Sequence, residues 1–233
     1  MTKYCKGCGA KLQNDDKDAI GYVPTLDASY CERCFRIRHY GDVTISMAQK
    51  IESNQTLDKI AKVKGVIFWV VDLFAFESNM ISRLNQKLDT DEIVLVLTKR
   101  DVLPKTLSDK KILEFVNRRL DEEGIKVKDI VICGYLLKHN EQSKACIDEI
   151  YSKIQMYRKG RDIVFMGVAN AGKSTILNQL LAMEDLTTSR HPGTTLDLVP
   201  IEQDGYTIYD TPGIENHHSV LTFLNSKDLK MVI

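Results

Sequence analysis

Short, continuous runs of apolar residues are the clearest pattern along this chain. The strongest lie at residues 66–71, 93–97 and 163–166, and shorter strand-like runs lie at residues 129–132 and 206–209. Uninterrupted apolar runs of this length are typical of strands that are buried on both faces of a parallel sheet. We therefore expect a sheet whose strands come from widely separated parts of the chain.

Helix-like stretches separate these runs. One apolar face consists of Ile112, Leu113, Val116 and Leu120, and a second of Cys146, Ile147, Ile150, Tyr151 and Ile154. Spacings of three and four residues place side chains on one side of a helix. Residues 174–183 have a similar pattern, and residues 44–64 are expected to form a helical connecting segment. Alternating strands and helices predict a doubly wound, mostly parallel α/β domain, which binds ligands at the carboxyl ends of its strands.

A phosphate-binding loop follows the run at residues 163–166. Gly167, Gly172, Lys173 and Ser174 satisfy the pattern Gly-x-x-x-x-Gly-Lys-Ser between a strand-like and a helix-like segment. The glycines let the backbone turn its N–H groups toward phosphate oxygens, and the helix directs its positive end at the same anion. Lys173 is expected to reach the β- and γ-phosphates, and Ser174 to bind Mg²⁺. The alternative is a chance Gly-Lys-Ser in a surface turn.

Two later segments fit a sensor of the third phosphate. Asp210-Thr211-Pro212-Gly213 closes the run at residues 206–209. Asp210 is expected to hold Mg²⁺ through water, and Gly213 to donate its N–H to the γ-phosphate. Between the loop and this motif lies the polar segment 192–197, in which Thr194 or, by preference, Thr195 would complete the Mg²⁺ shell. An ordinary Pro-Gly turn is the alternative for Asp210 to Gly213.

A guanine-reading box follows the run at residues 93–97. In Thr98-Lys99-Arg100-Asp101, Asp101 would accept hydrogen bonds from guanine, and the stem of Lys99 would pack along the base. The usual first residue is asparagine, and Thr98 makes fewer hydrogen bonds than an amide. A second base contact is expected from a backbone N–H at Cys133-Gly134. The alternative interpretation of the box is a charged strand end.

The order of these motifs indicates circular permutation. In most GTP-binding domains the phosphate loop comes before the guanine-reading box, whereas here it comes after it. Permutation preserves the site because the strands keep their places in space. Lys159-Gly160-Arg161 would then be the segment that joins the original ends of the domain.

Four cysteines near the N-terminus form two Cys-x-x-Cys pairs, Cys5 with Cys8 and Cys31 with Cys34. Four thiolates fill the tetrahedral positions of zinc, so the predicted site is structural rather than catalytic, and iron is possible at the same ligands. Disulfides or redox pairs are the competing interpretations, and the polar N-terminus gives no support for an oxidising compartment. Cys133 and Cys146 have no paired spacing and are expected to be packing residues.

With these motifs placed, the chain resembles the bacterial YqeH-type family of circularly permuted GTPases, which carry an N-terminal four-cysteine zinc finger and are associated with assembly of the small ribosomal subunit. The resemblance rests on the two cysteine pairs, Asn170 to Thr175, Pro192 to Asp197, and Asp210 to Ile214. It implies a zinc-finger module at residues 1–43, a connecting segment at 44–64 and a permuted GTPase domain at 65–233. Thr98 departs from the family's asparagine, and family members continue into a further domain beyond Ile233.

The resemblance also implies the ligands and the site. The implied cofactors are GTP or GDP, Mg²⁺ and Zn²⁺, with K⁺ as a further candidate. Asn170 matches an asparagine that binds K⁺ in related GTPases. The alternative role of Asn170 is a hydrogen bond that stabilises the loop. The expected nucleotide contacts are Thr98, Lys99, Asp101, Cys133, Gly134, Gly167, Asn170, Ala171, Gly172, Lys173, Ser174, Thr175, Thr194, Thr195, Asp210 and Gly213. Lys173, Thr195 and Gly213 would act in catalysis.

Hydrolysis is expected without a glutamine. Ile214 stands near the position at which a Ras-like GTPase places the glutamine that orients water, and isoleucine cannot hydrogen-bond a water. A monovalent cation at Asn170 could neutralise charge in the transition state. We therefore expect slow intrinsic GTP hydrolysis that K⁺ and a partner stimulate. His217 and His218 follow, and are more simply solvated than catalytic.

Composition restricts the partners. The chain has 233 residues, and 32 basic residues balance 32 acidic ones, so no global field attracts it to nucleic acid. RNA contact must be local, and Arg33, Arg36, Arg38 and His39, with Phe35 and Tyr40 as stacking rings, offer it beside the zinc cysteines. The alternative is a solvated surface with Phe35 packed inward. No apolar run approaches the roughly 18 residues of a membrane span, and residence is expected to be cytoplasmic.

The leading hypothesis is a GTP-driven switch that docks on a precursor of the small ribosomal subunit, contacting rRNA and ribosomal proteins, and leaves after hydrolysis. An ATP-handling enzyme on the same phosphate-binding fold is one rival, and Asp101 argues against it. A zinc-dependent RNA- or protein-binding module with a non-hydrolysing nucleotide site is the other. The sequence does not predict an oligomeric state.

Overall fold

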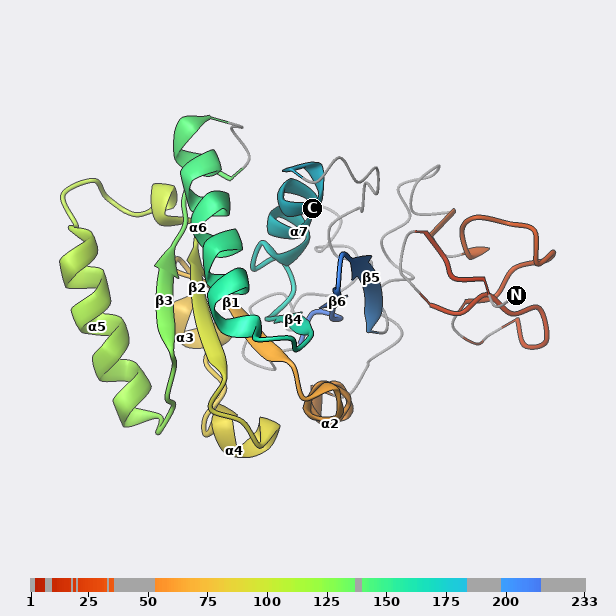
Figure 1. Cartoon of the computed structure of the whole chain (residues 1–233), viewed down its shortest axis with the longest axis horizontal. Helices are drawn as coiled ribbons and strands as arrows, with labels where there is room; N and C mark the ends of the chain where they lie inside the picture. The colour runs from red at the N-terminus through yellow and green to blue at the C-terminus, as the bar shows by residue number, and fades with distance from the viewer. Residues whose placement is uncertain are drawn as a thin grey trace, which may run out of the picture.

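The computed structural model describes residues 3–6, 10–17, 19, 21–32, 34–35, 53–136, 140–183 and 198–214. Its centre is a six-stranded sheet in the order β3-β2-β1-β4-β6-β5 (Figure 1). The strands are β1 (Val66–Asp72), β2 (Ile93–Thr98), β3 (Asp129–Ile132), β4 (Ile163–Met166), β5 (Val199–Gln203) and β6 (Tyr206–Asp210). Five strands are parallel, and β5 pairs antiparallel with β6. The predicted α/β fold is confirmed.

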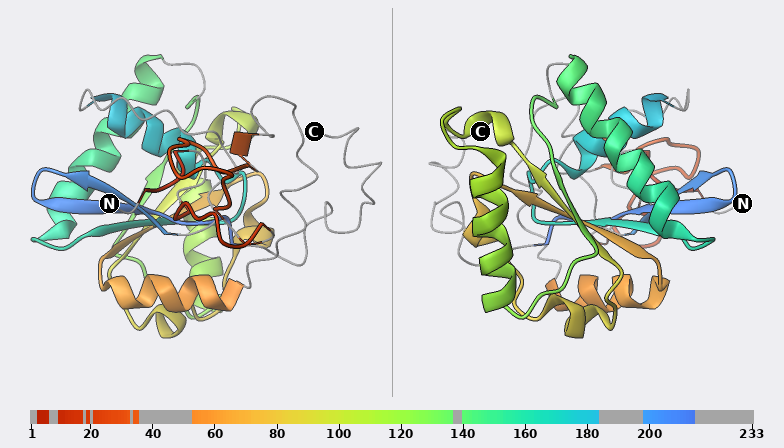
Figure 2. Two further views of the ribbon diagram at one scale, coloured as in Figure 1. Left: turned by 90° about the vertical axis from the view of Figure 1, so that its right-hand side faces the viewer. Right: turned by 60° about the vertical axis from the view of Figure 1, so that its left-hand side comes forward.

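Helices cover both faces of this sheet (Figure 2). They are α2 (Ser53–Val63), α3 (Phe76–Asn79), α4 (Leu84–Leu88), α5 (Asp109–Glu122), α6 (Glu141–Arg158) and α7 (Lys173–Met183), with a short 3₁₀ turn, η2 (Arg100–Val102). The two longest begin at capping residues. Oδ1 of Asn140 accepts a hydrogen bond from the N–H of Ser143, and Ser108 likewise accepts from Lys111. Such caps satisfy backbone donors that the first helical turn leaves unpaired.

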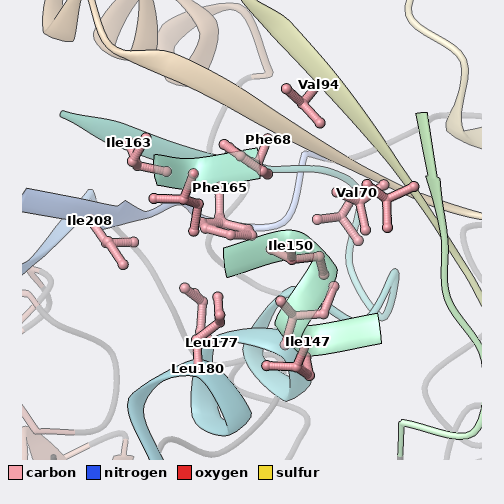
Figure 3. Packing of buried hydrophobic residues seen from close by; sticks show 14 of the residues in the cluster. Phe68, Val70, Val94, Ile147, Ile150, Ile163, Phe165, Leu177, Leu180 and Ile208 are labelled. Carbon is pink, nitrogen blue, oxygen red and sulfur yellow. The ribbon is translucent and has the colours of Figure 1, made fainter. Parts of the chain in front are cut away.

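Alternate residues of the central strands face opposite hydrophobic layers. Phe68 and Val70 of β1 point toward α6 and α7, where Ile147, Ile150 and Leu177 meet them (Figure 3). The neighbours Ile67, Trp69 and Val71 pack instead with residues of α2, α4 and α5. Both layers exclude water from the strands, which explains their uninterrupted apolar sequence.

One expectation about the helices needs correction. Tyr151 is 37% exposed, so it does not belong to the buried face of α6 that Cys146, Ile147, Ile150 and Ile154 form. Of the segment 44–64 that was expected to be helical, residues 53–63 form α2, and residues 44–52 lie outside the described part of the chain. In α2, Ile60 is fully buried, and Leu57 lies in the same layer against the sheet.

The chain visits the sheet in a permuted order. From β1 it runs outward through β2 to β3, and α6 then returns it to the other side of β1, where β4 lies. The joining turn after α6 has left-handed backbone at Lys159 and Gly160. Arg161 donates to Oε2 of Glu92 over 2.8 Å, and this hydrogen bond is the largest cause that lowers the pKa of Glu92. The joining segment is therefore fixed at the amino ends of the strands.

The N-terminal module has a small core of its own. Leu12, Val23 and Ala10 pack with three cysteines in a cluster separate from both layers of the sheet (Figure 1). Among the residues that the structure describes, none of the helices combines the length and the apolar character that crossing a bilayer requires.

Candidate nucleotide site

Those predicted nucleotide contacts that the structure describes follow the ends of neighbouring strands in the middle of the sheet. β1 and β4 are neighbours, and the chain continues from β1 to one side and from β4 to the other. Such a switch point leaves a crevice outside the carboxyl ends of the strands. The guanine-reading box leaves this edge after Thr98, the phosphate loop after Met166 and the Asp-Thr-Pro-Gly motif at Asp210.

The phosphate loop depends on its glycines. Gly167 has φ +154°, and a Cβ on it would lie 2.2 Å from the carbonyl oxygen of Val70. Gly172 has φ +102°, with Thr98 directly beside it. Asn170 is exposed and adopts φ +62°, which is unusual for a residue with a side chain. The loop therefore turns tightly over the end of β1, in the geometry that exposes backbone N–H groups.

Lys173 begins α7 and is buried. Its Nζ donates to the carbonyl oxygens of Gly167 and Val168, each over 2.9 Å. Burial lowers the pKa of Lys173 to about 8, and the negative charge of Asp210 opposes this shift. The ammonium thus lies inside the loop, bonded to acceptors that phosphate oxygens can replace.

The Asp-Thr-Pro-Gly segment runs along the phosphate loop. The N–H of Thr211 donates to Phe165, and that of Ile214 donates to Gly167. A Cβ on Gly213 would lie 2.8 Å from Cα of Ala169, so the two backbones touch. Ile214 is 5% exposed and packs in the hydrophobic layer below. Its side chain is therefore part of the hydrophobic core, and hydrolysis without a water-orienting glutamine remains a prediction.

Thr98 is fully buried, and its side chain does not face the site. Its hydroxyl donates to the carbonyl oxygen of Ala171 over 2.6 Å and contacts that of Val71 at 3.3 Å. The box is thereby bonded to the phosphate loop. A threonine hydroxyl is sufficient for this contact, so the departure from asparagine leaves the link between the two loops intact.

Asp101 meets the loop after β3. Its Oδ1 accepts from the N–H of Tyr135 over 2.9 Å, while the N–H of Arg100 donates to Cys133. A Cβ on Gly134 would lie 3.2 Å from the backbone nitrogen of Asp101, so this position favours glycine. Asp101 and Gly134 also line a cavity of about 440 Å³ that extends along α6. The two expected base contacts are therefore adjacent.

Comparison with known proteins agrees with this geometry. The family model described as "50S ribosome-binding GTPase" matches residues 162–233. YqeH of Bacillus subtilis (strain 168) is 34% identical over 238 residues, which cover 98% of this chain and 63% of that protein. The chain is thus similar to the YqeH-type circularly permuted GTPases along almost its whole length. The NO-associated protein 1 of Arabidopsis thaliana, named as chloroplastic/mitochondrial, is 29% identical over 97% of this chain and 46% of its own length.

The chain spans less than two thirds of the length of these relatives. Among solved structures, YjeQ from Thermotoga maritima is 20% identical over 65% of this chain and 49% of its own, with a TM-score of 0.38.

Three cysteines of the N-terminal module converge. The sulfur atoms of Cys5, Cys31 and Cys34 are buried and lie within 4.8 Å of one another. The N–H of Cys31 donates to Sγ of Cys5 over 3.2 Å. Convergent buried thiols with a backbone donor fit a tetrahedral metal ion. Cys8, the fourth predicted ligand, lies outside the described residues.

Cys133 and Cys146 pack in the core as expected, but the disulfide between them was not predicted. They form a disulfide between the end of β3 and the first turns of α6, with 5.6 Å between their Cα atoms. The N–H of Cys133 donates to Leu97, so Gly134 is the residue of this pair that remains for a base contact.

Several predicted residues lie outside the parts of the chain that the structure describes. They are Thr194, Thr195, Arg33, Arg36, Arg38, His39, Tyr40, His217 and His218. Conversely, Asp72 was not predicted. It ends β1, and its Oδ2 lies 2.5 Å from Nζ of Lys99. An aspartate directly after a buried apolar run was a signal that could have found it.

Proposed function

We propose that this chain binds GTP and GDP through the site at the carboxyl edge of the sheet, hydrolyses GTP slowly, and acts as a switch in assembly of the small ribosomal subunit. The observation that carries the proposal is the bond between Thr98 and Ala171, because it joins the guanine-reading box to the phosphate loop. Asp101 then supports guanine over adenine, since a carboxylate accepts hydrogen bonds and adenine offers no N1–H.

The roles of the phosphate-site residues follow from their positions. Backbone N–H groups from Asn170 to Thr175 would surround the β-phosphate at the start of α7. Lys173 would exchange the carbonyls of Gly167 and Val168 for phosphate oxygens, whose negative charge favours the ammonium form. Gly213 lies against Ala169, so a third phosphate would meet its N–H. The segment after β6 would thereby distinguish GTP from GDP.

Mg²⁺ fits the donors at this edge. The hydroxyl of Ser174 stands one residue beyond the buried Lys173, and Asp210 is buried at the end of β6. These two residues and Thr195 are the proposed ligands, and the ion would neutralise charge on the β- and γ-phosphates. Asn170 is exposed at the top of the loop, where it supports the proposal that K⁺ stimulates hydrolysis.

The N-terminal module is proposed to hold Zn²⁺ through Cys5, Cys8, Cys31 and Cys34 and to contact RNA. Phe35 follows Cys34 directly and is 46% exposed, so it does not pack inward as the alternative interpretation required. An exposed ring beside Arg33, Arg36 and Arg38 suits stacking on an unpaired base. We propose cytoplasmic residence and no membrane association.

The first experiment measures base preference. The zinc-loaded chain is titrated with fluorescent GDP and ADP in K⁺ buffer with Mg²⁺, alongside an Asp101→Asn variant. We expect GDP to bind at least tenfold more tightly than ADP and the variant to lose that preference. Equal binding of ADP would contradict the guanine assignment and favour an ATP-handling enzyme.

The second experiment measures turnover and the ribosomal partner. GTP hydrolysis is followed in K⁺ and in Na⁺, with small or large ribosomal subunits added separately. We expect stimulation by K⁺ and by the small subunit. The large subunit is a necessary comparison because the description of the matching family model names the 50S particle. No hydrolysis with either particle would favour a non-hydrolysing binding module.

A further inference from the structure

A buried carboxylate stands behind the lysine of the guanine-reading box. Asp72 is 6% exposed, and its Oδ2 lies 2.5 Å from Nζ of Lys99. The pairing of β1 with β2 places Asp72 opposite Thr98, the residue directly before Lys99. The register of the two strands therefore brings the side chains of Asp72 and Lys99 together. A buried carboxylate needs such a partner, because charge is costly away from water.

The position of this carboxylate is fixed from several sides. Its Oδ1 accepts from the N–H of Phe74 over 2.8 Å, and the N–H of Asp72 donates to Oδ1 of Asn79 over 3.2 Å. Asn79 is itself buried and donates to the carbonyl oxygen of Ala75. Asp72 therefore cannot swing toward another cation. Lys99 is the movable partner, since its side chain is 39% exposed.

We infer that Asp72 is a positioning residue for guanine recognition, which acts by holding the side chain of Lys99 in place before the base arrives. The inference rests on the guanine site proposed above. Lys99 has left-handed backbone, φ +59°, at the start of η2. With its backbone set by that turn and its ammonium set by Asp72, the methylene stem between them is held as a surface for one face of the base.

Asp101, the base-reading carboxylate of the same box, has a partner of its own. Its Oδ1 accepts from the N–H of Tyr135 over 2.9 Å. The lysine and the aspartate of the box are thus each held by a different neighbour, Lys99 by Asp72 and Asp101 by the loop after β3.

A second ion pair provides a matched control. Asp129, at the opposite edge of the sheet, has Oδ2 2.5 Å from Nζ of Lys153 and accepts from the N–H of Ile130 at Oδ1. Its chemistry is similar to that of Asp72, with one lysine and one local backbone donor, and the hydroxyl of Tyr157 also donates to its Oδ2 over 3.1 Å. It begins β3, whereas the nucleotide site lies where the strands end.

The test is a double-mutant cycle on GDP affinity, using D72N, K99M, the double variant and D129N. Asparagine keeps an oxygen for the N–H of Phe74, removes the charge, and puts an amide NH₂ in place of the oxygen that accepts from Lys99. We expect D72N and K99M each to weaken GDP binding about tenfold, and the double variant to be no weaker than K99M alone. D129N should bind GDP like the wild type, and D72E, which restores the charge, should bind more tightly than D72N.

Each other outcome overturns the inference. GDP affinity unchanged in D72N, or effects of D72N and K99M that multiply, would show that Asp72 does not act through Lys99. Equal losses of GDP affinity in D72N and D129N would show that both ion pairs act only by stabilising the fold. If D72N does not fold, D72S keeps an acceptor for Phe74 and takes its place in the cycle. Failure of the wild type to bind GDP would instead contradict the proposed function itself.

Discussion

The hydroxyl of Thr98 donates a hydrogen bond to the carbonyl oxygen of Ala171, with 2.6 Å between the two oxygens. The two residues are 73 positions apart in the chain and belong to the two loops that would read the base and the phosphates. Both are fully buried. The bond therefore joins the two loops directly inside the protein.

Replacement of Thr98 by valine tests this link. Valine keeps the shape and leaves the buried carbonyl of Ala171 without its donor, which should lower the free energy of unfolding by about 1–2 kcal/mol. GDP affinity should fall about tenfold, because the loops lose their register. Thr98→Ser, which keeps the hydroxyl, is the control. It should retain most of the stability and most of the GDP affinity. Wild-type affinity in the valine variant would show that the loops are held by other contacts.

Gly213→Ala tests the contact between the sensor segment and the phosphate loop. The added methyl would meet backbone atoms of Ala169 at 2.8–2.9 Å, so one of the two segments must move. We expect GTP affinity, measured with a slowly hydrolysed analogue, to fall more than tenfold, and GDP affinity to fall less.

Gly124→Ala is the control for a general loss of stability without close contact. Gly124 has φ +64°, a left-handed conformation that Gly213 does not share, and a Cβ there meets no atom within 4 Å. The Gly124→Ala variant should have a free energy of unfolding about 1–2 kcal/mol lower, because alanine is strained in left-handed backbone. Its nucleotide binding should be unchanged. If Gly213→Ala behaves in the same way, close contact with Ala169 is irrelevant to the third phosphate.

Lys173 should make the stability of the nucleotide-free chain depend on pH. Its pKa is about 8 in the folded chain and about 10.5 when exposed, so between these values the unfolded chain binds more protons. Stability therefore rises with pH across that window, by about 3 kcal/mol in total. The measurement is urea unfolding from pH 7 to 10.5 of the wild type and Lys173→Met. The difference between the two curves isolates Lys173, and a constant difference would contradict the lowered pKa.

The disulfide between Cys133 and Cys146 should stabilise the folded chain. It closes a loop between residues 13 positions apart, for which restriction of the unfolded chain gives about 3 kcal/mol. A thiol reductant should lower the urea midpoint of the wild type and leave that of Cys146→Ser unchanged. A reductant effect of equal size in both proteins would place its origin elsewhere, for example at the N-terminal cysteines.

The sequence predicted the strands that are buried on both faces. The run at residues 163–166 coincides with β4, because a strand covered by two layers needs apolar residues at every position. β5 was not predicted. It is an edge strand in which only alternate residues are buried, and it contains Pro200, which an edge tolerates. Its short, mixed pattern resembles that of a loop.

The side-chain links of the site were beyond the sequence. The pair between Asp72 and Lys99 depends on the register of β1 and β2, and the disulfide depends on how α6 packs beside β3. Periodicity places residues on a face of one element but does not say which residue of another element they meet. The motifs predicted which segments form loops at this edge of the sheet, and the structure shows why Gly167 and Gly172 are needed there. The hydrogen-bond partners of Thr98, Asp101 and Lys173 could be identified only from the structure.

The permuted order has a consequence for how the chain supplies the site. Permutation places β1 ahead of the phosphate loop in the chain while β1 stays beside β4 in the sheet. The chain therefore reaches the phosphate loop only after the guanine-reading box is in place, and β6 brings Gly213 and Ile214 against the loop last. A base and its phosphates would thus be bound by segments that the chain supplies in the reverse of the usual order.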